Sequence, residues 1–519
     1  MKLKIIIPFA IMAALISAGC SKLKETPLAS LTPGTYFKTE ADLDACVAAI
    51  YQNMVADAGY AFDYPTYPYF GADDLTTNPA NGKSSQPEWD QLNASPSNGQ
   101  INSDWQTPWT AIRNANVVTD NYQKIPASAA RNQAVGDALF VRAWSYFILV
   151  RTYGPLPVII TGEPATYRPP RDSVAKVYAQ IVSDLQAAIG ILPAYTGAQQ
   201  SSGRATQNAA RTLLAEVYLT MATWPLNQTS NYALAAAESD SVILSNQYSL
   251  VPDYGQVFTT NENSESVFAL HFNVAGGAPN RLFGDCAGDW DEVGEDGNFG
   301  WEEFYPEINF FLAAPPCTRT NEEFYTQIKL IRPDKKTFDI VPYNSPRCVA
   351  ALQHPQYRKF RAGLVVGGVA TGINETDSTI ISMNPSTNKT TDIFRYPMAL
   401  LCFAEASDMA GGGPTAAGYA ALNLVRARAG EGPMAAGLSQ IAFRDTVVFE
   451  RAYEFAAEYG MRWYDIQRLQ ILPQVVAARS PVELSISAAS MAALQTRYYS
   501  PIPLNEMLKN PTWTQNPGY

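Results

Sequence analysis

Histidine and charged residues are scarce in this sequence. Only His271 and His354 occur among 519 residues, and Asp, Glu, Lys and Arg together make up 16% of the chain. Two isolated histidines, neither in a His-Glu-x-x-His helix, are a poor basis for a zinc protease centre or a Ser-His-Asp triad. The sequence also lacks a Gly-x-Ser-x-Gly elbow and a glycine-rich loop followed by Lys-Ser/Thr. These absences argue against several common classes of enzyme.

Apolar runs long enough to span a bilayer are absent beyond the first twenty residues. Lys2 and Lys4 precede an uncharged, mostly apolar run, Ile5 to Gly19, which is shorter than the roughly 20 residues of a membrane span. Small residues then precede Cys20, as in a bacterial lipobox, where the cysteine becomes the lipid-carrying N-terminus. We therefore expect a signal peptide over 1–19, lipidation at Cys20 and a polar tether over 20–39.

The cysteine count and the charge balance exclude further classes. Cys46, Cys286, Cys317, Cys348 and Cys402 remain after Cys20, an odd number with no C-x-x-C spacing for zinc, and their pairing stays open. The chain has 48 acidic and 37 basic residues and no strongly basic stripe, so we expect no nucleic-acid partner. Aromatic residues reach 11%, a balance that suits neutral ligands bound on aromatic surfaces.

Apolar residues recur at helical spacing in several segments, which predicts a mainly α-helical fold. The predicted helices are Ala129–Tyr153, Asn208–Thr220, Ala399–Ala410, Thr415–Ala429 and a long helical region over Gln440–Gln470 in which Gly460 is a candidate break. Two regions, Ala58–Ser103 and Val274–Lys389, are rich in Gly, Pro, Asn or Ser and are predicted to be mostly loops. Loops on a rigid helical scaffold are where binding usually takes place.

Motifs along most of the mature chain resemble those of the SusD/RagB family of lipoproteins. The resemblance rests on Trp109-Thr110 with Ile112, Ala115 and Asn116; on Ala138 to Phe147 followed by Tyr153-Gly154-Pro155; on Arg395-Tyr396 with Ala404-Glu405-Ala406; on Asn423 to Gly430; on Glu450-Arg451 with Glu454, Gly460, Arg462 and Asp465; and on the closing Gln515-Asn516-Pro517-Gly518-Tyr519.

The resemblance implies a fold, a location and a partner. The fold would be a scaffold of tetratricopeptide-like helical repeats over 40–270 and 390–519, with loop and short β-hairpin insertions. Residues 271–389 would form a loop-rich insertion and part of the ligand face. The protein would be anchored in the outer membrane through its N-terminal lipid alone, facing the cell surface. It would act as a lid on a SusC-like TonB-dependent transporter, without catalysis.

Aromatic residues in the two loop regions are the candidate ligand contacts, because sugar rings stack their C–H faces on Trp and Tyr. The candidates are Trp89, Tyr67, Tyr64 and Tyr69 in the first region and Trp290, Trp301 and Tyr305 in the second. We predict one shallow platform that combines Trp89 with Trp290, Trp301 or Tyr305, while core burial is the alternative for each ring. The resemblance adds Asp73 and Asp74, which lie where the family usually has an acidic residue near its ligand loop.

Two clusters of carboxylates invite other interpretations. Glu454, Glu458 and Arg462 are spaced four apart, which predicts a salt-bridge ladder on one helical face rather than catalytic acids. Asp289 to Asn298 is a dense oxygen cluster for which calcium is a candidate, although its spacing fails the EF-hand pattern and a solvated acidic loop is the alternative. No other cofactor or metal is expected.

The residues and the resemblance together favour capture of an oligosaccharide for a transporter. One alternative is capture of a peptide by the same architecture, as in the RagB branch, through strand pairing. Another is a surface glycosidase, which requires two carboxyl groups roughly 5 to 9 Å apart. No motif supports the glycosidase, and the aromatic-rich, charge-poor loops favour sugar over peptide.

Overall fold

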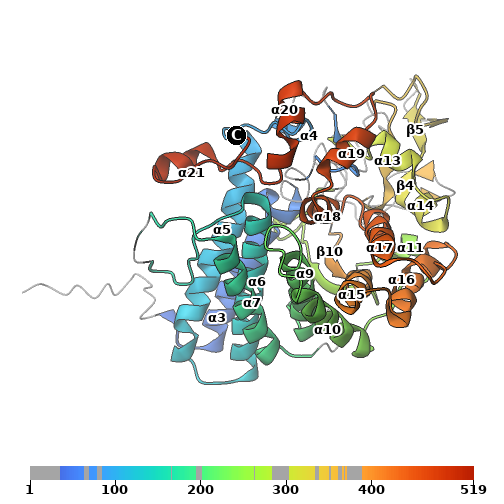
Figure 1. The fold of residues 1–519 in the computed structure, drawn as a ribbon. Helices are drawn as coiled ribbons and strands as arrows, with labels where there is room; N and C mark the ends of the chain where they lie inside the picture. Colours follow the sequence, from blue (N-terminus) through green and yellow to red (C-terminus); the bar gives the residue numbers. More distant parts are fainter. Residues whose placement is uncertain are drawn as a thin grey trace, which may run out of the picture.

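Helices form most of the described chain, as the sequence predicts, and strands are few and short (Figure 1). The computed structural model describes residues 36–62, 69, 71–78, 85–164, 166, 168–194, 202–261, 263–282, 303–332, 338–349, 352–360, 365–366, 369–370 and 388–519. Among these residues no helix combines the length and the apolar character that crossing a bilayer requires.

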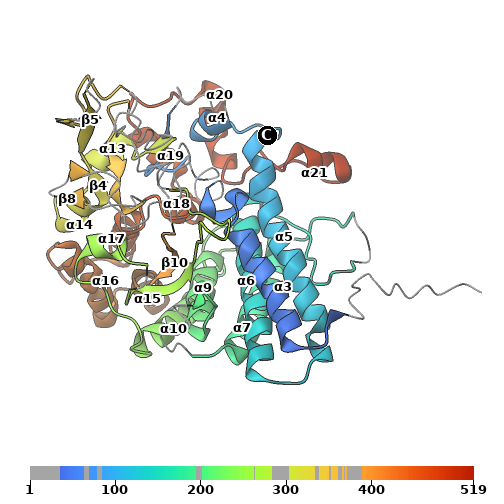
Figure 2. The ribbon, with the colours of Figure 1, turned by 180° about the vertical axis from the view of Figure 1, so that it is seen from behind.

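Successive helices pack side by side to form the scaffold. In chain order they are α3 (Glu40–Met54), α5 (Gly99–Asn121), α6 (Ala129–Tyr153), α7 (Val174–Ile191), α9 (Gln207–Met221), α10 (Asn231–Leu244), α15 (Tyr396–Gly411), α16 (Ala416–Ala429) and α17 (Gln440–Glu454). Each of them packs on at least one neighbour in this series, and α15 packs on α10 although a long stretch of chain separates them. Figures 1 and 2 show α3, α5, α6 and α7 together on one side of the molecule. The N-terminal and C-terminal helices therefore share one core.

Local signals in the sequence explain where these helices begin and end. The Ser128 hydroxyl accepts a hydrogen bond from the Arg131 amide at 3.1 Å and starts α6, and Gly154, with φ of 72°, ends it. Thr415 and Gly430 delimit α16 in the same way. The predicted bounds of α6 are confirmed, and those of α9, α15 and α16 are confirmed to within a few residues.

Short strands and helices occupy the described parts of the two loop regions. They are η1 (Asp57–Ala61), β1 (Thr76–Thr77), α4 (Ser85–Asp90), β3 (Phe304–Tyr305), α13 (Ile308–Leu312), α14 (Thr318–Glu323), β4 (Phe324–Tyr325), β5 (Gln327–Ile331), β6 (Phe338–Pro342), β7 (Gln356–Tyr357), β8 (Val365–Val366) and β9 (Val369–Ala370). The strands pair as β1–β3, as β4–β7, and as the four-stranded sheet β6-β5-β9-β8. Since β1 belongs to the first loop region and β3 to the second, the expectation that the scaffold brings these regions together is confirmed.

Strands on either side of residues 271–389 pair with each other. β2 (Ser266–Leu270) runs antiparallel to β10 (Thr391–Arg395), with irregularities after Asp392. Asn280 reinforces the junction, because its side-chain amide donates to the Lys389 carbonyl at 2.9 Å and to the Thr391 hydroxyl at 3.0 Å. The chain thus leaves the scaffold and returns to it at one place.

The helical region 440–470 is interrupted at Gly460, the break that the sequence predicts, and forms two helices. α17 ends at Glu454, and α18 (Met461–Leu469) begins only after a turn in which Ala457, Tyr459 and Gly460 have positive φ. A Cβ at position 460 would lie 2.4 Å from the Tyr69 ring, so only glycine fits there. Glu458 lies in this turn, and the predicted ladder of four-residue steps from Glu454 to Arg462 is therefore wrong in its geometry.

Glu454 lies instead at the centre of a buried ion-pair network. Its carboxylate contacts Arg319 of α14 at 3.3 Å, Arg395 of β10 at 2.9 Å and Arg428 of α16. Burial alone would raise the pKa of Glu454, but the three guanidinium groups outweigh burial and lower it to about 2. Other members of the network are Glu265, Glu323, Glu431, Glu450, Glu458, Lys359 and Arg426. The expectation that these charges are structural rather than catalytic agrees with this geometry.

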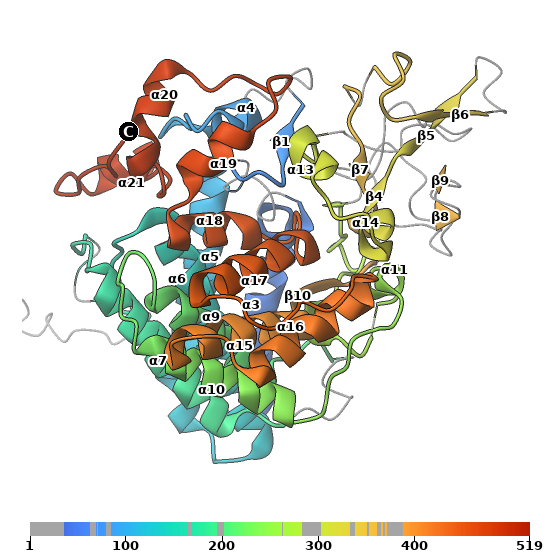
Figure 3. The ribbon, with the colours of Figure 1, turned by 45° about the vertical axis from the view of Figure 1, so that its right-hand side comes forward.

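A second buried network joins α17 to α18 and to the scaffold. Arg451 contacts Asp465 at 2.8 Å and Glu216 of α9 at 3.0 Å, and Arg468 bridges Asp465 to Glu405 of α15. Burial opposes ionisation of Asp465, but the two guanidinium groups lower its pKa to about 2. The remaining C-terminal elements are α19 (Leu472–Ala478), α20 (Ala488–Ala493) and α21 (Leu504–Lys509). Figure 3 shows α18 between α17 and the C-terminal elements.

We predict that Glu454→Gln lowers the free energy of unfolding by roughly 3 to 5 kcal/mol, because it leaves three buried guanidinium groups short of an anion. The matched control is Glu238→Gln, whose partner Arg211 is partly exposed and whose loss costs about 1 kcal/mol or less. Both values come from urea unfolding at pH 7.

The same pair of variants gives a pH test. A carboxyl whose folded pKa is depressed stabilises the fold above its unfolded pKa, and this contribution is lost as the pH falls toward about 2. The difference between wild type and Glu454→Gln should therefore shrink as the pH falls below about 4. A difference that is small at pH 7, or constant down to pH 3, would refute the central role of Glu454.

Candidate functional site

The two described members of the predicted aromatic platform are buried. Trp89 of α4 is 5% exposed, and Tyr305 of β3 is fully buried between His354, whose ring lies 5.2 Å away, and the Asn78 amide, which donates to the Tyr305 hydroxyl at 2.9 Å. Tyr305 belongs to the β1–β3 pair that unites the two loop regions, and Trp89 packs in the main hydrophobic core. The assignment of Trp89 and Tyr305 as exposed ligand contacts is therefore wrong in this structure.

The other predicted aromatic contacts divide into two groups. Tyr69 is also buried, and its hydroxyl lies 3.1 Å from the Tyr464 hydroxyl. Tyr64, Tyr67, Trp290 and Trp301 lie outside the described residues, so their assignment stays a prediction.

Asp74 supports the fold rather than facing a ligand. Its carboxylate accepts a hydrogen bond from the Ala457 amide at 2.7 Å, and its backbone carbonyl accepts one from the Tyr357 hydroxyl. Burial, with a smaller effect from the neighbouring Asp73 carboxylate, raises the pKa of Asp74 to about 7. Asp74 thereby holds the turn after α17 in place, and its assignment as a ligand contact is wrong here.

Asp73 is only partly buried and pairs with Arg462 of α18. Its two carboxylate oxygens each accept a hydrogen bond of 2.6 Å from the guanidinium group, a bidentate arrangement. This pair lies at the edge of an open cleft with a volume of about 440 Å³. Of the acidic candidates from the sequence, Asp73 alone reaches a described cleft.

This α17 cleft lies between α13, α17, α18 and α19, and it has a wall of aromatic rings. The Phe310 and Tyr453 rings stack at 4.5 Å between centroids, and Phe449, which is 44% exposed, lies 5.0 Å from Tyr453. Polar groups at the cleft include Asp73, Arg462, Asn309, Arg444, Asp445 and Gln474. Apolar rings with a few placed polar groups are the usual make-up of a small-ligand site.

Sequence reasoning missed the rings of the α17 cleft. Val448 and Ala452 also line the cleft, but the helical spacing of this region does not single out Phe449 and Tyr453. These two residues are four apart and share a helical face, which was the available signal. Phe310 comes from the loop-rich insertion, where no periodicity marks it.

The carboxyl group inside this cleft has a structural role. Glu307 caps α13, since it accepts hydrogen bonds from the Phe310 amide at 2.8 Å and the Ser480 amide at 2.7 Å. Burial raises the pKa of Glu307 despite these bonds. Both of its oxygens are thus engaged with backbone donors.

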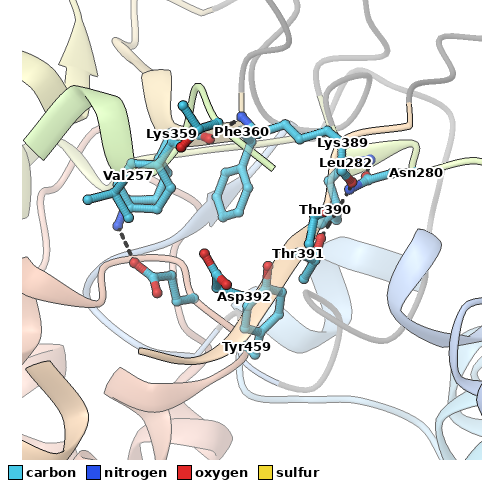
Figure 4. A pocket seen from close by; sticks show the side chains of 13 residues that line it. Val257, Asn280, Leu282, Lys359, Phe360, Lys389, Thr390, Thr391, Asp392 and Tyr459 are labelled. Carbon is cyan, nitrogen blue, oxygen red and sulfur yellow. Dashed lines mark hydrogen bonds and ion pairs between the residues drawn. The ribbon is translucent and has the colours of Figure 1, made fainter. Parts of the chain in front are cut away.

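A second cavity is too small for a sugar. It has a volume of about 30 Å³, close to the space of one water molecule, and lies beside the β2–β10 junction. Figure 4 shows the Asp392 carboxylate and the Phe360 ring pointing toward each other across it. Lys359 at its edge is bound to Glu458 at 2.9 Å and to the Ala456 carbonyl at 2.9 Å. This cavity belongs to the buried charge network.

Thiols and possible metal ligands add no site in the described part of the chain. Cys46, Cys317, Cys348 and Cys402 are free thiols, and Cys286 lies outside the described residues. His354 lies 3.1 Å from Glu483, and His271 follows the end of β2 instead of lying within it. The described residues include no cluster of His, Cys, Asp and Glu that could hold a metal ion. The acidic segment Asp289 to Asn298 is outside them, so calcium there stays a prediction.

Comparisons with known proteins give a consistent result. Residues 29–219 match a family described as "Starch-binding associating with outer membrane", and residues 366–519 match the SusD family. SusD-like protein P2 of Formosa agariphila is 25% identical, and the match covers 98% of each chain. A SusD-like protein of Bacteroides ovatus is also 25% identical over 87% of this chain and 80% of its own.

Solved structures share the fold. A SusD homolog from Bacteroides thetaiotaomicron superposes with a TM-score of 0.78 at 21% identity, covering 94% of this chain and 98% of that one. A laminarin-binding SusD-like protein gives 0.70 at 21% identity, covering 93% and 100%. Surface glycan-binding protein A from Bacteroides thetaiotaomicron gives 0.71 at 22% identity, with the same coverage.

We predict that Asp74→Asn stabilises the protein at pH 8 relative to wild type, by roughly 1 to 3 kcal/mol, and by much less at pH 4. Between the pKa of about 4 in the unfolded chain and the pKa of about 7 in the fold, this carboxyl ionises only on unfolding, so it costs stability as the pH rises across that range. The neutral amide avoids this penalty. Thermal unfolding at both pH values measures the difference. Asp240→Asn on α10, a carboxylate with no hydrogen bond or ion pair to another described residue, is the control, and an equal response of the two variants would contradict the assignment.

Proposed function

This chain belongs to the SusD/RagB family, and on that premise we propose that it captures a glycan at the cell surface and delivers it to a SusC-like TonB-dependent transporter. The observation that carries the proposal is family membership over both ends of the chain, together with structural neighbours described as binding laminarin or surface glycans. The lipid on Cys20 anchors the protein in the outer membrane, facing outward. Because capture takes place beside the transporter, the captured glycan is delivered to it.

The α17 cleft forms the described part of the ligand face in this proposal. The exposed ring of Phe449 offers an apolar face for stacking against pyranose C–H groups, and the buried Tyr453 ring supports it from behind. The Asp73–Arg462 pair presents fixed hydrogen-bonding groups at the edge of the cleft for sugar hydroxyls. Tyr67, Trp290 and Trp301 are proposed to extend this face.

Binding without cleavage is the proposed outcome for the bound glycan. Glycoside hydrolysis needs a raised-pKa acid and a second carboxylate at a set distance across the scissile bond. In the cleft, Glu307 is held by two backbone amides, Asp73 by the Arg462 guanidinium group and Asp445 by that of Arg444. All three carboxyl groups thus have other contacts, which favours a binding protein over a glycosidase.

We predict that Phe449→Ala weakens glycan binding by roughly 1 to 2 kcal/mol, about five- to thirtyfold in Kd, because it removes an exposed stacking ring. Calorimetric titration of the soluble body, without residues 1–20, with laminarihexaose and maltoheptaose measures the affinity. Leu244→Ala, which truncates a 67% exposed side chain on α10, is the control and should bind like wild type. Chromatography of the glycan after long incubation should show no shorter products.

Three results would change the proposal. Release of shorter sugars identifies a glycosidase. Binding of peptides instead of glycans in the same titration favours the RagB-like alternative. Equal affinity of Phe449→Ala and wild type for the glycan removes the α17 cleft from the ligand face but leaves glycan capture standing.

We also predict that Cys20→Ala releases the protein from the outer-membrane fraction, because the variant has no thiol to carry the lipid. Membrane fractionation with immunodetection measures this. Cys46→Ala, which removes a partly buried free thiol of α3, should stay with the membrane. Recovery of Cys20→Ala at wild-type levels in the membrane fraction would refute lipid anchoring at this residue.

A further inference from the structure

A second open groove lies away from the α17 cleft and shares none of its lining residues. It has a volume of about 380 Å³ and lies between α5, the segment after α6, and the C-terminal region that contains α21. Figures 1 and 2 show α21 beside the upper part of α5. The groove is lined by Trp105, Gln106, Trp109, Thr110, Arg113, Pro157, Ile159, Pro169, Glu506, Lys509, Asn510 and Trp513. We call it the tryptophan groove.

Three indole rings meet in this groove, two from α5 and one from the C-terminal region. Trp105 is buried, and its ring lies 5.8 Å from Trp109 and 6.2 Å from Trp513 between centroids. The Trp513 indole N–H donates to the Pro169 carbonyl at 2.9 Å, which fixes the orientation of that ring. Trp109 and Trp513 are partly exposed. The buried ring thus supports two rings that remain accessible.

Several polar groups beside these rings have no partner among the described residues. Gln106 and Arg113 are exposed, flank Trp109 on one face of α5, and form no hydrogen bond or ion pair with another described residue. Asn510 is 6% exposed, and its side-chain oxygen has no hydrogen-bond partner among the described residues. The indole N–H of Trp109 also has no hydrogen-bond partner among the described residues. Buried polar groups normally form hydrogen bonds, so a polar ligand in the groove would supply the missing hydrogen-bond partners.

Charge in the groove is nearly balanced. Lys509 pairs with Glu506 at 2.8 Å, which leaves Arg113 as the one cation of the lining without an ion pair to the described residues. A strongly anionic ligand would meet one free cation and one carboxylate. Stacking surfaces with donors and acceptors, and little net charge, suit a neutral polyhydroxylated chain.

We propose that the tryptophan groove is a second glycan-binding site, which takes a neutral oligosaccharide. The pyranose C–H faces stack on Trp109 and Trp513, and Gln106 and Arg113 donate to the sugar hydroxyls. This inference rests on the proposed function, because the ligand is the glycan that the protein captures. Two separate sites on one body hold a long polysaccharide at two points, which raises its effective affinity without any new contact between the sites.

The test is calorimetric titration of the soluble body with laminarihexaose, maltoheptaose and xylohexaose. For the bound sugar, Trp513→Ala should lower the affinity of one class of sites roughly ten- to hundredfold, or remove one site from the stoichiometry. The double variant Gln106→Ala with Arg113→Ala should give a smaller loss of roughly three- to tenfold, and it leaves the fold intact because both side chains are exposed and unpaired. Affinity in the groove should respond little to added salt.

Matched variants separate this inference from the proposed function. Phe449→Ala should affect the α17 cleft alone, so combining it with Trp513→Ala should abolish binding that either single variant retains. If Trp513→Ala and the double variant both bind the sugar as wild type does, the tryptophan groove is not a glycan site and the proposed function stands. If wild type binds none of the three neutral sugars, the proposed function and this inference fall together. Binding by wild type that vanishes with salt contradicts the neutral ligand.

Discussion

The structure depends on burying many charges together without leaving any of them alone. Around Glu454, guanidinium groups from α14, α16 and β10 converge on carboxylates from α17 and from the residue before β2. Each ion would cost several kcal/mol if it were buried without its partners, so these elements hold one mutual arrangement. The hydrophobic core holds the helices together, and the buried ion pairs fix how the C-terminal helices pack against the insertion. The site inherits its shape from this arrangement, since α17 and α13 both line the cleft.

Helices and their caps followed from the sequence, because their causes are local. Ser128, Thr415, Gly154 and Gly430 mark ends that a reader of the chain can find, and apolar spacing marks the faces between them. The motifs near both ends of the chain led to the family. These signals depend on neighbours within a few residues, where spacing translates directly into geometry.

The ends of α17 and the ligand contacts did not follow, because their causes are distant in sequence. α17 stops at Glu454 where the next turn is held by the Asp74 carboxylate, and no residue near position 454 announces it. Tyr305 is buried where β1 and β3 pair across more than two hundred residues, and Trp89 of α4 is buried in the main hydrophobic core. The sequence around an aromatic residue in a polar segment does not show whether its ring faces solvent or packs on a strand from a distant part of the chain. The roles of Asp73 and Asp74 depend on their partners. Arg462 holds Asp73 at the cleft, whereas the backbone amide of Ala457 holds Asp74 in the interior.

The pairing of β2 with β10 has a consequence for how such proteins diversify. The insertion enters and leaves the scaffold through two strands that are hydrogen-bonded to each other, and Asn280 ties the exit to the entry. Segments between these two ends can therefore change in length without opening the scaffold, provided that Arg319 and Lys359 keep their buried carboxylate partners. A laboratory exchange of residues 283–387 between distant relatives would use the same seam, and the incoming segment would have to bring both cations with it.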